Sequence, residues 1–244
     1  MSSTDEDSFR IVGIGASAGG LEALEAFFSN MPTTNDFAFV VIQHLSPDYK
    51  SLMGELLAKH TQMQIVHAED GMIIEAGSVY LIPRKKNMTV YQRRLFLTQQ
   101  EHGLNLPIDI FFRSLAEDAG ESAVGVILSG TGSDGTRGAR AIKEFGGLVI
   151  VQDVDDAKFD GMPRSAIATG LIDFVLPAAQ IPAELQNFVT GHAKISEAGG
   201  TAQHPDTGAL TKIYMLVKRR TGVDLSYYKE STITRRIERR MGIN

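Results

Sequence analysis

The sequence predicts an α/β protein with a doubly wound, mainly parallel sheet flanked by helices, plus an antiparallel hairpin and a short all-α C-terminal segment. Short apolar runs alternate with amphipathic stretches, which is typical of a parallel sheet with crossover helices. The run 88–98 interrupts this rhythm and predicts a hairpin turning near 92–94. Strands are expected at 9–14, 37–43, 63–67, 77–82, 123–128, 147–151 and 172–176, and helices at 20–30, 51–60, 108–118, 136–145, 163–169 and 181–190.

A glycine-rich turn, residues 13–20, follows the first predicted strand and leads into a helix. The spacing Gly13-x-Gly15-x-x-Ala18 satisfies a relaxed dinucleotide fingerprint, which also requires an acidic residue at the tip of the next strand. That strand ends in Gln43-His44, so the ribose ligand is missing. We therefore expect no nicotinamide or flavin cofactor.

The same turn contains Gly15-x-Ser17-x-Gly19, the pattern of a nucleophile elbow. His44 follows the next predicted strand, and Asp134 lies in the glycine-rich turn after strand 123–128. Open α/β sheets build their sites at the carboxyl ends of strands. A catalytic triad is defined by geometry rather than chain order. The three residues together therefore predict a Ser-His-Asp hydrolase.

Each member of this triad also has a structural interpretation. Ser17 could be the N-cap of the helix that follows it, and Asp134 could be the N-cap of helix 136–145. His44 could be a hydrogen-bonded histidine at a strand end. It is the occurrence of all three at strand tips that favours catalysis.

Four motifs in this order resemble the catalytic domain of the CheB-type chemotaxis receptor methylesterases. They are residues 14–20, Gln43-His44, residues 125–135 and Gly161-Met162-Pro163-Arg164, and the resemblance covers about 8–192. It implies a serine hydrolase that removes methyl esters from glutamyl side chains of receptor helices, and many such enzymes also deamidate glutamines. The implied triad is Ser17, His44 and Asp134.

Within that mechanism, the oxyanion needs backbone donors next to the nucleophile. The N–H of Ala18 is the first candidate, and an amide of the turn 130–132, assigned to Thr131, is the second. A non-catalytic docking or regulatory module built on the same fold is the alternative function.

Two features differ from the stand-alone methylesterases. Only the polar leader 1–8 precedes the first strand, so we expect no attached receiver domain to gate the chain. Where stand-alone members have an Arg-Pro-Ser pattern bordering the cleft, this chain has Leu106-Pro107-Ile108.

The C-terminal residues 213–224 and 228–241 resemble the start of the N-terminal helical subdomain of CheR-type receptor methyltransferases. We expect a methylesterase domain at 1–192, a linker at 193–207 and a partial methyltransferase subdomain at 208–244. The remainder of a methyltransferase is expected to follow in the full-length chain.

Composition narrows the function classes. The chain has no cysteine, which excludes thiol catalysis and zinc–thiolate sites. No signal peptide and no apolar run of membrane-spanning length is seen, so we expect a cytoplasmic protein without direct membrane insertion. Residues 1–193 hold 14 basic and 24 acidic residues, whereas 194–244 hold 10 and 5.

The expected partner is a methylated receptor or another signalling protein. A nucleic acid is not expected, because the basic stretch 235–240 has no reading motif and its attached domain is acidic. The aspartates at 153, 155, 156 and 160 lack the spacing of a calcium loop, so we expect a solvated acidic loop and no metal.

Overall fold

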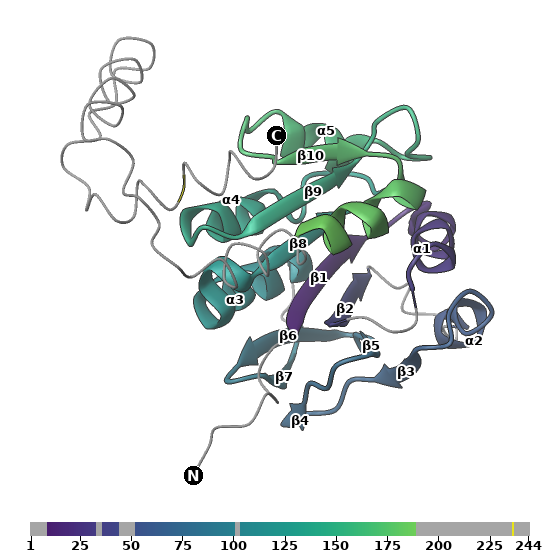
Figure 1. The fold of residues 1–244 in the computed structure, drawn as a ribbon. Coiled ribbons are helices and arrows are strands. Elements are labelled where there is room, and N and C mark those ends of the chain that lie inside the picture. Colours follow the sequence, from purple (N-terminus) through teal and green to yellow (C-terminus); the bar gives the residue numbers. More distant parts are fainter. Residues whose placement is uncertain (1–8, 33–35, 44–51, 101–102, 189–235, 237–244) are drawn as a thin grey trace, which may run out of the picture. The chain divides into compact units, whose positions relative to one another are not determined.

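The computed structural model describes residues 9–32, 36–43, 52–100, 103–188 and 236. The chain divides into two compact units, Met1–Ala183 and Glu184–Asn244. The first unit contains both sheets and the helices that cover them (Figure 1). Of the second unit, residues 184–188 and Arg236 are described, and they are helical. Apart from Arg236, the all-α segment predicted at 208–244 lies outside the described residues.

A seven-stranded parallel sheet forms the centre of the first unit, in the order β10-β9-β8-β1-β2-β5-β3 (Figure 1). The doubly wound, mainly parallel sheet is therefore confirmed. All seven predicted strands are present, and their bounds lie within two residues of the predicted ones. They are β1 (Arg10–Ala16), β2 (Phe37–Gln43), β3 (Gln64–His67), β5 (Ser78–Leu81), β8 (Val124–Ile127), β9 (Leu148–Gln152) and β10 (Phe174–Leu176).

The predicted hairpin is also confirmed, as β6 (Lys86–Tyr91) and β7 (Arg94–Gln99). Its two turn residues, Gln92 and Arg93, have φ of 49° and 57°, as in the two-residue turns that match strand twist. Asp118 accepts both of their N–H groups. The two-residue strand β4 (Met72–Ile73) completes this small sheet and was not predicted, because it is too short to show a sequence pattern.

The helices are α1 (Gly20–Ser29), α2 (Met53–Leu57), α3 (Pro107–Ala119), α4 (Thr136–Glu144) and α5 (Gly161–Ile167). Short 3₁₀ turns occupy η1 (Gly120–Ser122) and η2 (Ala178–Gln180). Residues 181–188 are helical as predicted. The helix predicted at 51–60 is shorter, and the one predicted from 163 begins two residues earlier. Among the described residues, no helix has the length and apolar character needed to cross a membrane.

Side chains alternate between the two faces of β2, and both faces are buried. Ala38, Val40 and Ile42 belong to a core that includes residues of α3, α4, α5 and the small sheet. Phe39 belongs to the opposite face, where it makes edge-on contacts with Phe27 and Phe28 of α1. Burial on both faces explains why the strand is a continuous apolar run instead of an alternating one.

Two glycines of β1 allow α3 to approach the sheet closely. A Cβ on Gly13 would lie 3.0 Å from the rings of Phe111 and Phe112. On Gly15 it would lie 2.5 Å from Cγ2 of Ile108. The glycine-rich sequence therefore serves helix packing as well as the turn, and it brings the start of α3 to the carboxyl end of β1.

Candidate active site

Three adjacent strands, β8, β1 and β2, end at the same edge of the sheet. Gly15 pairs with Ile127 of β8, and Ala16 pairs with Gln43 of β2. Ser17 directly follows β1, and the turn that contains Asp134 follows β8. His44 directly follows β2 but lies outside the described residues. The sheet thus brings together the ends of the three strands that the predicted triad residues follow.

The backbone at Ser17 forms a tight turn. Its N–H donates to the carbonyl of Ser129 at 2.9 Å, and its own carbonyl accepts the N–H of Gly20 at 2.9 Å. Helix α1 begins at Gly20 with Gly19 as the N-cap (φ 69°) and without a side-chain cap. The interpretation of Ser17 as the N-cap of this helix is therefore wrong, because Gly19 occupies that position.

Gly130 packs directly against the candidate nucleophile. A Cβ at this position would lie 2.9 Å from Cβ of Ser17 and 2.2 Å from Sδ of Met162. A real Cβ atom does not come that close to its neighbours, so a side chain here would displace one of them. Met162, from the predicted Met-Pro motif, is fully buried in this contact.

Asp134 is buried, and its carboxylate accepts three backbone N–H groups. Ile108 donates at 3.0 Å, Asp109 at 2.9 Å and Gly135 at 2.9 Å. The first two belong to the first turn of α3, where the helix dipole also stabilises negative charge. Helix α4 has Gly135 as its N-cap and no side-chain cap, so the interpretation of Asp134 as the N-cap of that helix is wrong. It caps α3 from outside the helix instead.

A second carboxyl, Asp109, lies beside Asp134. Its Oδ1 accepts the N–H of Gly138 at 2.8 Å, while Oδ2 is buried without a hydrogen-bond partner among the described residues. Burial raises the pKa of Asp109, and the nearby charge of Asp134 acts in the same direction. Asp134 thus caps α3, and Asp109 of α3 bonds α4 in return.

Some of the backbone N–H groups near Ser17 already donate to a carbonyl of the described chain, and others do not. The N–H of Ser17 is bonded to Ser129, and that of Gly130 donates to the carbonyl of Phe159 at 2.9 Å. Within the described part of the chain, the N–H groups of Ala18 and Thr131 have no acceptor. Gly130 is therefore unsuitable as an oxyanion donor, whereas neither predicted donor is bonded to a described residue.

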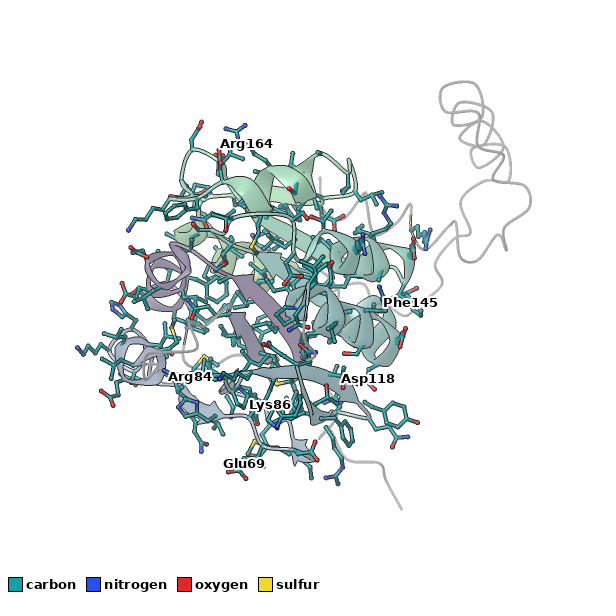
Figure 2. The ribbon with its side chains drawn as sticks, turned by 180° about the vertical axis from the view of Figure 1, so that it is seen from behind. Glu69, Arg84, Lys86, Asp118, Phe145 and Arg164 are labelled. Carbon is teal, nitrogen blue, oxygen red and sulfur yellow. The ribbon has the colours of Figure 1, made fainter. Side chains whose placement is uncertain are left out.

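The acidic loop 153–160 makes hydrogen bonds and an ion pair of its own. Asp156 accepts the side-chain N–H of Gln152 at 2.8 Å and the N–H of Ala178 at 2.8 Å. Asp160 pairs with Arg164 of α5, which Figure 2 shows at the outer surface of the domain. The described residues contain no group of three or more acidic or histidine side chains that could hold a metal ion.

Two residues of this region were missed in the sequence. Ser129 is fully buried and bonds both the Ser17 turn and the acidic loop. Asp109 was not distinguished from the other polar residues of its helix. Its one sequence signal was its position in the first turn of a helix that begins with Pro107, because proline is common at the first helical position. Both roles depend on long-range contacts that a single sequence does not display.

The fold and this edge define an open α/β protein with a candidate hydrolase site at its strand ends. The CheB methylesterase family matches residues 12–185, so the chain belongs to that family. The all-alpha domain of CheR methyltransferase matches residues 209–244. The crystal structure of the Thermotoga maritima CheB methylesterase catalytic domain is similar, with a TM-score of 0.67 and 32% identity. The match covers 73% of this chain and 97% of the Thermotoga maritima chain.

Two curated relatives are similar to this chain over different shares of their own length. An uncharacterised 104.1 kDa protein of Rhodobacter capsulatus is 42% identical over 214 residues, which are 78% of this chain and 22% of that protein. The protein-glutamate methylesterase/protein-glutamine glutaminase of Thermotoga maritima is 34% identical over 191 residues, 75% and 55% of the two chains. This chain therefore spans between about a fifth and about half of the length of these relatives.

Proposed function

We propose that this chain is a serine hydrolase that removes methyl esters from glutamyl side chains of chemotaxis-type receptors. The observation that carries the proposal is the strand order β8-β1-β2, because Asp134, Ser17 and His44 each follow one of these adjacent strands. The family match and the names of the curated relatives support the same activity.

In the first half of the proposed reaction, His44 takes the proton of the Ser17 hydroxyl while Oγ attacks the ester carbonyl. The N–H groups of Ala18 and Thr131 stabilise the oxyanion that forms. Asp134 holds the imidazole and stabilises its cationic form. The carboxylate of Asp134 accepts three backbone N–H groups, which fix its orientation, and we propose that it also accepts the imidazole N–H of His44.

In the second half, His44 returns its proton to the leaving oxygen, and methanol departs. The glutamyl acyl group is then bonded to Oγ of Ser17. His44 next takes a proton from water, whose oxygen attacks the acyl carbon. Release of the serine oxygen, with return of the proton, restores the enzyme and frees the glutamate.

Amide hydrolysis is a second activity for the same site. The curated relatives are named glutaminases as well as methylesterases. The steps are identical, except that ammonia leaves in place of methanol. Ammonia release from a receptor fragment with unmodified glutamines tests this activity separately.

The proposal also covers the setting of the reaction. The partner is a methylated receptor or another signalling protein in the cytoplasm, without nucleic acid. The domains we propose are a methylesterase at 1–192, a linker at 193–207 and a methyltransferase subdomain at 208–244, the last supported by the match at 209–244.

Labelling with a fluorophosphonate tests the role of Ser17. We expect one label per chain, on Ser17, and none in Ser17→Ala. Ser114→Ala is the matched control, because its hydroxyl bonds Val90 and Phe111 away from the site, and it should label like the wild type. A folded wild type that is not labelled would favour the alternative, a non-catalytic docking module.

A further inference from the structure

Ser129 forms hydrogen bonds with the backbone on both sides of the Ser17–Ala18 peptide group. The carbonyl of Ser129 accepts the N–H of Ser17 at 2.9 Å. Its hydroxyl donates to the carbonyl of Ala18 at 2.8 Å. These two bonds fix the peptide groups before Ser17 and after Ala18. The peptide group between them carries the Ala18 N–H that we assign to the oxyanion hole.

The hydroxyl of Ser129 is also tied to the loop on the other side. It accepts the N–H of Phe159 at 3.0 Å, and the carbonyl of Phe159 lies 3.3 Å from it. The fit is tight, because a Cβ on Gly19 would lie 2.7 Å from this oxygen. Ser129 is fully buried, so the bonds are protected from competition by water.

Two further polar side chains hold Ser129 in place. Its N–H donates to Oε1 of Gln152 at 2.8 Å. The other end of that amide donates to Asp156, which accepts the N–H of Ala178 as well. Gln152 is 2% exposed, and its amide spans from the end of β9 to the acidic loop. The turn at Ser17 is therefore braced through a chain of hydrogen bonds that reaches η2.

We propose that Ser129 is a positioning residue for the reaction, which sets the orientation of Ser17 Oγ and of the Ala18 N–H without touching the substrate. This inference rests on the proposed function. A misplacement of about 1 Å in an active site can cost on the order of a hundredfold in rate. Removing the hydroxyl should therefore lower kcat while leaving KM near the wild-type value.

The test compares Ser129→Ala, Ser129→Thr and Ser114→Ala in the full chain. Each hydroxyl accepts one N–H and has a single proton to donate, which in Ser129 is shared between two carbonyls, so we expect a similar loss of thermal stability. For Ser129→Ala alone we expect kcat for ester hydrolysis and the rate of phosphonate labelling to fall about tenfold to a hundredfold. Ser129→Thr keeps the hydroxyl and should recover most of that loss.

Two results would overturn the inference. One is Ser129→Ala with kcat and labelling rate no lower than those of Ser114→Ala. The other is Ser129→Thr that is as stable as the wild type but no more active than Ser129→Ala.

Amide hydrogen exchange gives a readout that does not depend on activity. In Ser129→Ala the N–H groups of Ser17 and Gly20 should exchange about tenfold faster than in Ser114→Ala, because the turn opens more easily. Faster exchange in a chain whose wild type hydrolyses no ester would uphold the bracing and reject the proposed function. Unchanged exchange would reject the bracing itself.

Discussion

Asp134 combines two tasks at the scale of single residues, since it caps α3 and, in the proposal, orients His44. Its three amide donors hold the carboxylate in place in the turn that follows β8. The same contacts couple catalysis to stability. A substitution of Asp134 should therefore change both the catalytic rate and the free energy of unfolding.

Asp134→Asn should lower kcat by about three to four orders of magnitude, as expected when the charge that stabilises the imidazolium is lost. It should also lower the free energy of unfolding by about 1–3 kcal/mol, because charge-assisted bonds to α3 are weakened. Steady-state kinetics and denaturant unfolding measure the two effects.

Asp118→Asn is the matched control for that change. Asp118 also accepts two backbone N–H groups, those of the hairpin turn, but it lies near Phe9 and Arg10 at the start of β1, whereas Ser17 follows the end of that strand. It should lose stability and keep full activity. An Asp134→Asn enzyme with wild-type kcat would remove this residue from the mechanism.

Asp109 should leave a signature in the pH dependence of stability. Its pKa is raised by burial, so the folded state holds this proton more tightly than the unfolded chain does. Its contribution to stability is fully present below the unfolded pKa of about 4 and is lost as the pH rises through the raised folded pKa.

Asp109→Asn keeps an acceptor for the Gly138 N–H and cannot ionise. The slope of unfolding free energy against pH above about 4 should therefore be less negative in the variant than in the wild type. Urea unfolding at a series of pH values measures that slope. Two parallel curves would contradict the assignment.

The packing of α3 on β1 is the contact between elements that positions the site. Gly15→Ala would place a methyl group 2.5 Å from Cγ2 of Ile108, and overpacking of this kind costs about 1–3 kcal/mol. Because Ile108 begins the helix turn that holds Asp134, the variant should also lose activity.

A double-mutant cycle tests this contact. Ile108→Ala alone opens a cavity, at a cost of about 2–5 kcal/mol. Combined with Gly15→Ala, the added methyl group fills part of that space, so the double variant should be more stable than the sum of the two changes predicts. Additive effects, measured by denaturant unfolding, would show that the helix and the strand adjust independently.

The sequence predicted elements better than it predicted contacts between them. The continuous apolar runs at 37–43 and 147–151 predicted the central strands, and the break at 88–98 predicted the hairpin, because these signals are local. Capping was misjudged, since Ser17 and Asp134 were each compared with the helix that follows them in the chain. The helix that Asp134 caps starts 27 residues earlier in the sequence. Ser129 was missed for the same reason.

At the scale of the whole molecule, the proposed domains predict the outcome of limited proteolysis. The linker 193–207 is rich in alanine, glycine and polar residues, and such segments are preferred cleavage sites. We expect an early cut there, identified by mass spectrometry, and a stable fragment close to 1–192. The fragment should keep the ester hydrolysis rate of the intact chain or exceed it if the basic C-terminal segment restrains the site. Early cleavage within 52–100 would contradict the proposed domain boundary.

The central claim is that Ser17 is the nucleophile of a protein-glutamate methylesterase. Methanol release from a methylated receptor fragment, measured for the wild type and for Ser17→Ala, tests it most directly. The account predicts release by the wild type and a fall of several orders of magnitude in the variant, because triad members act as a unit. Release by Ser17→Ala at the wild-type rate would contradict it.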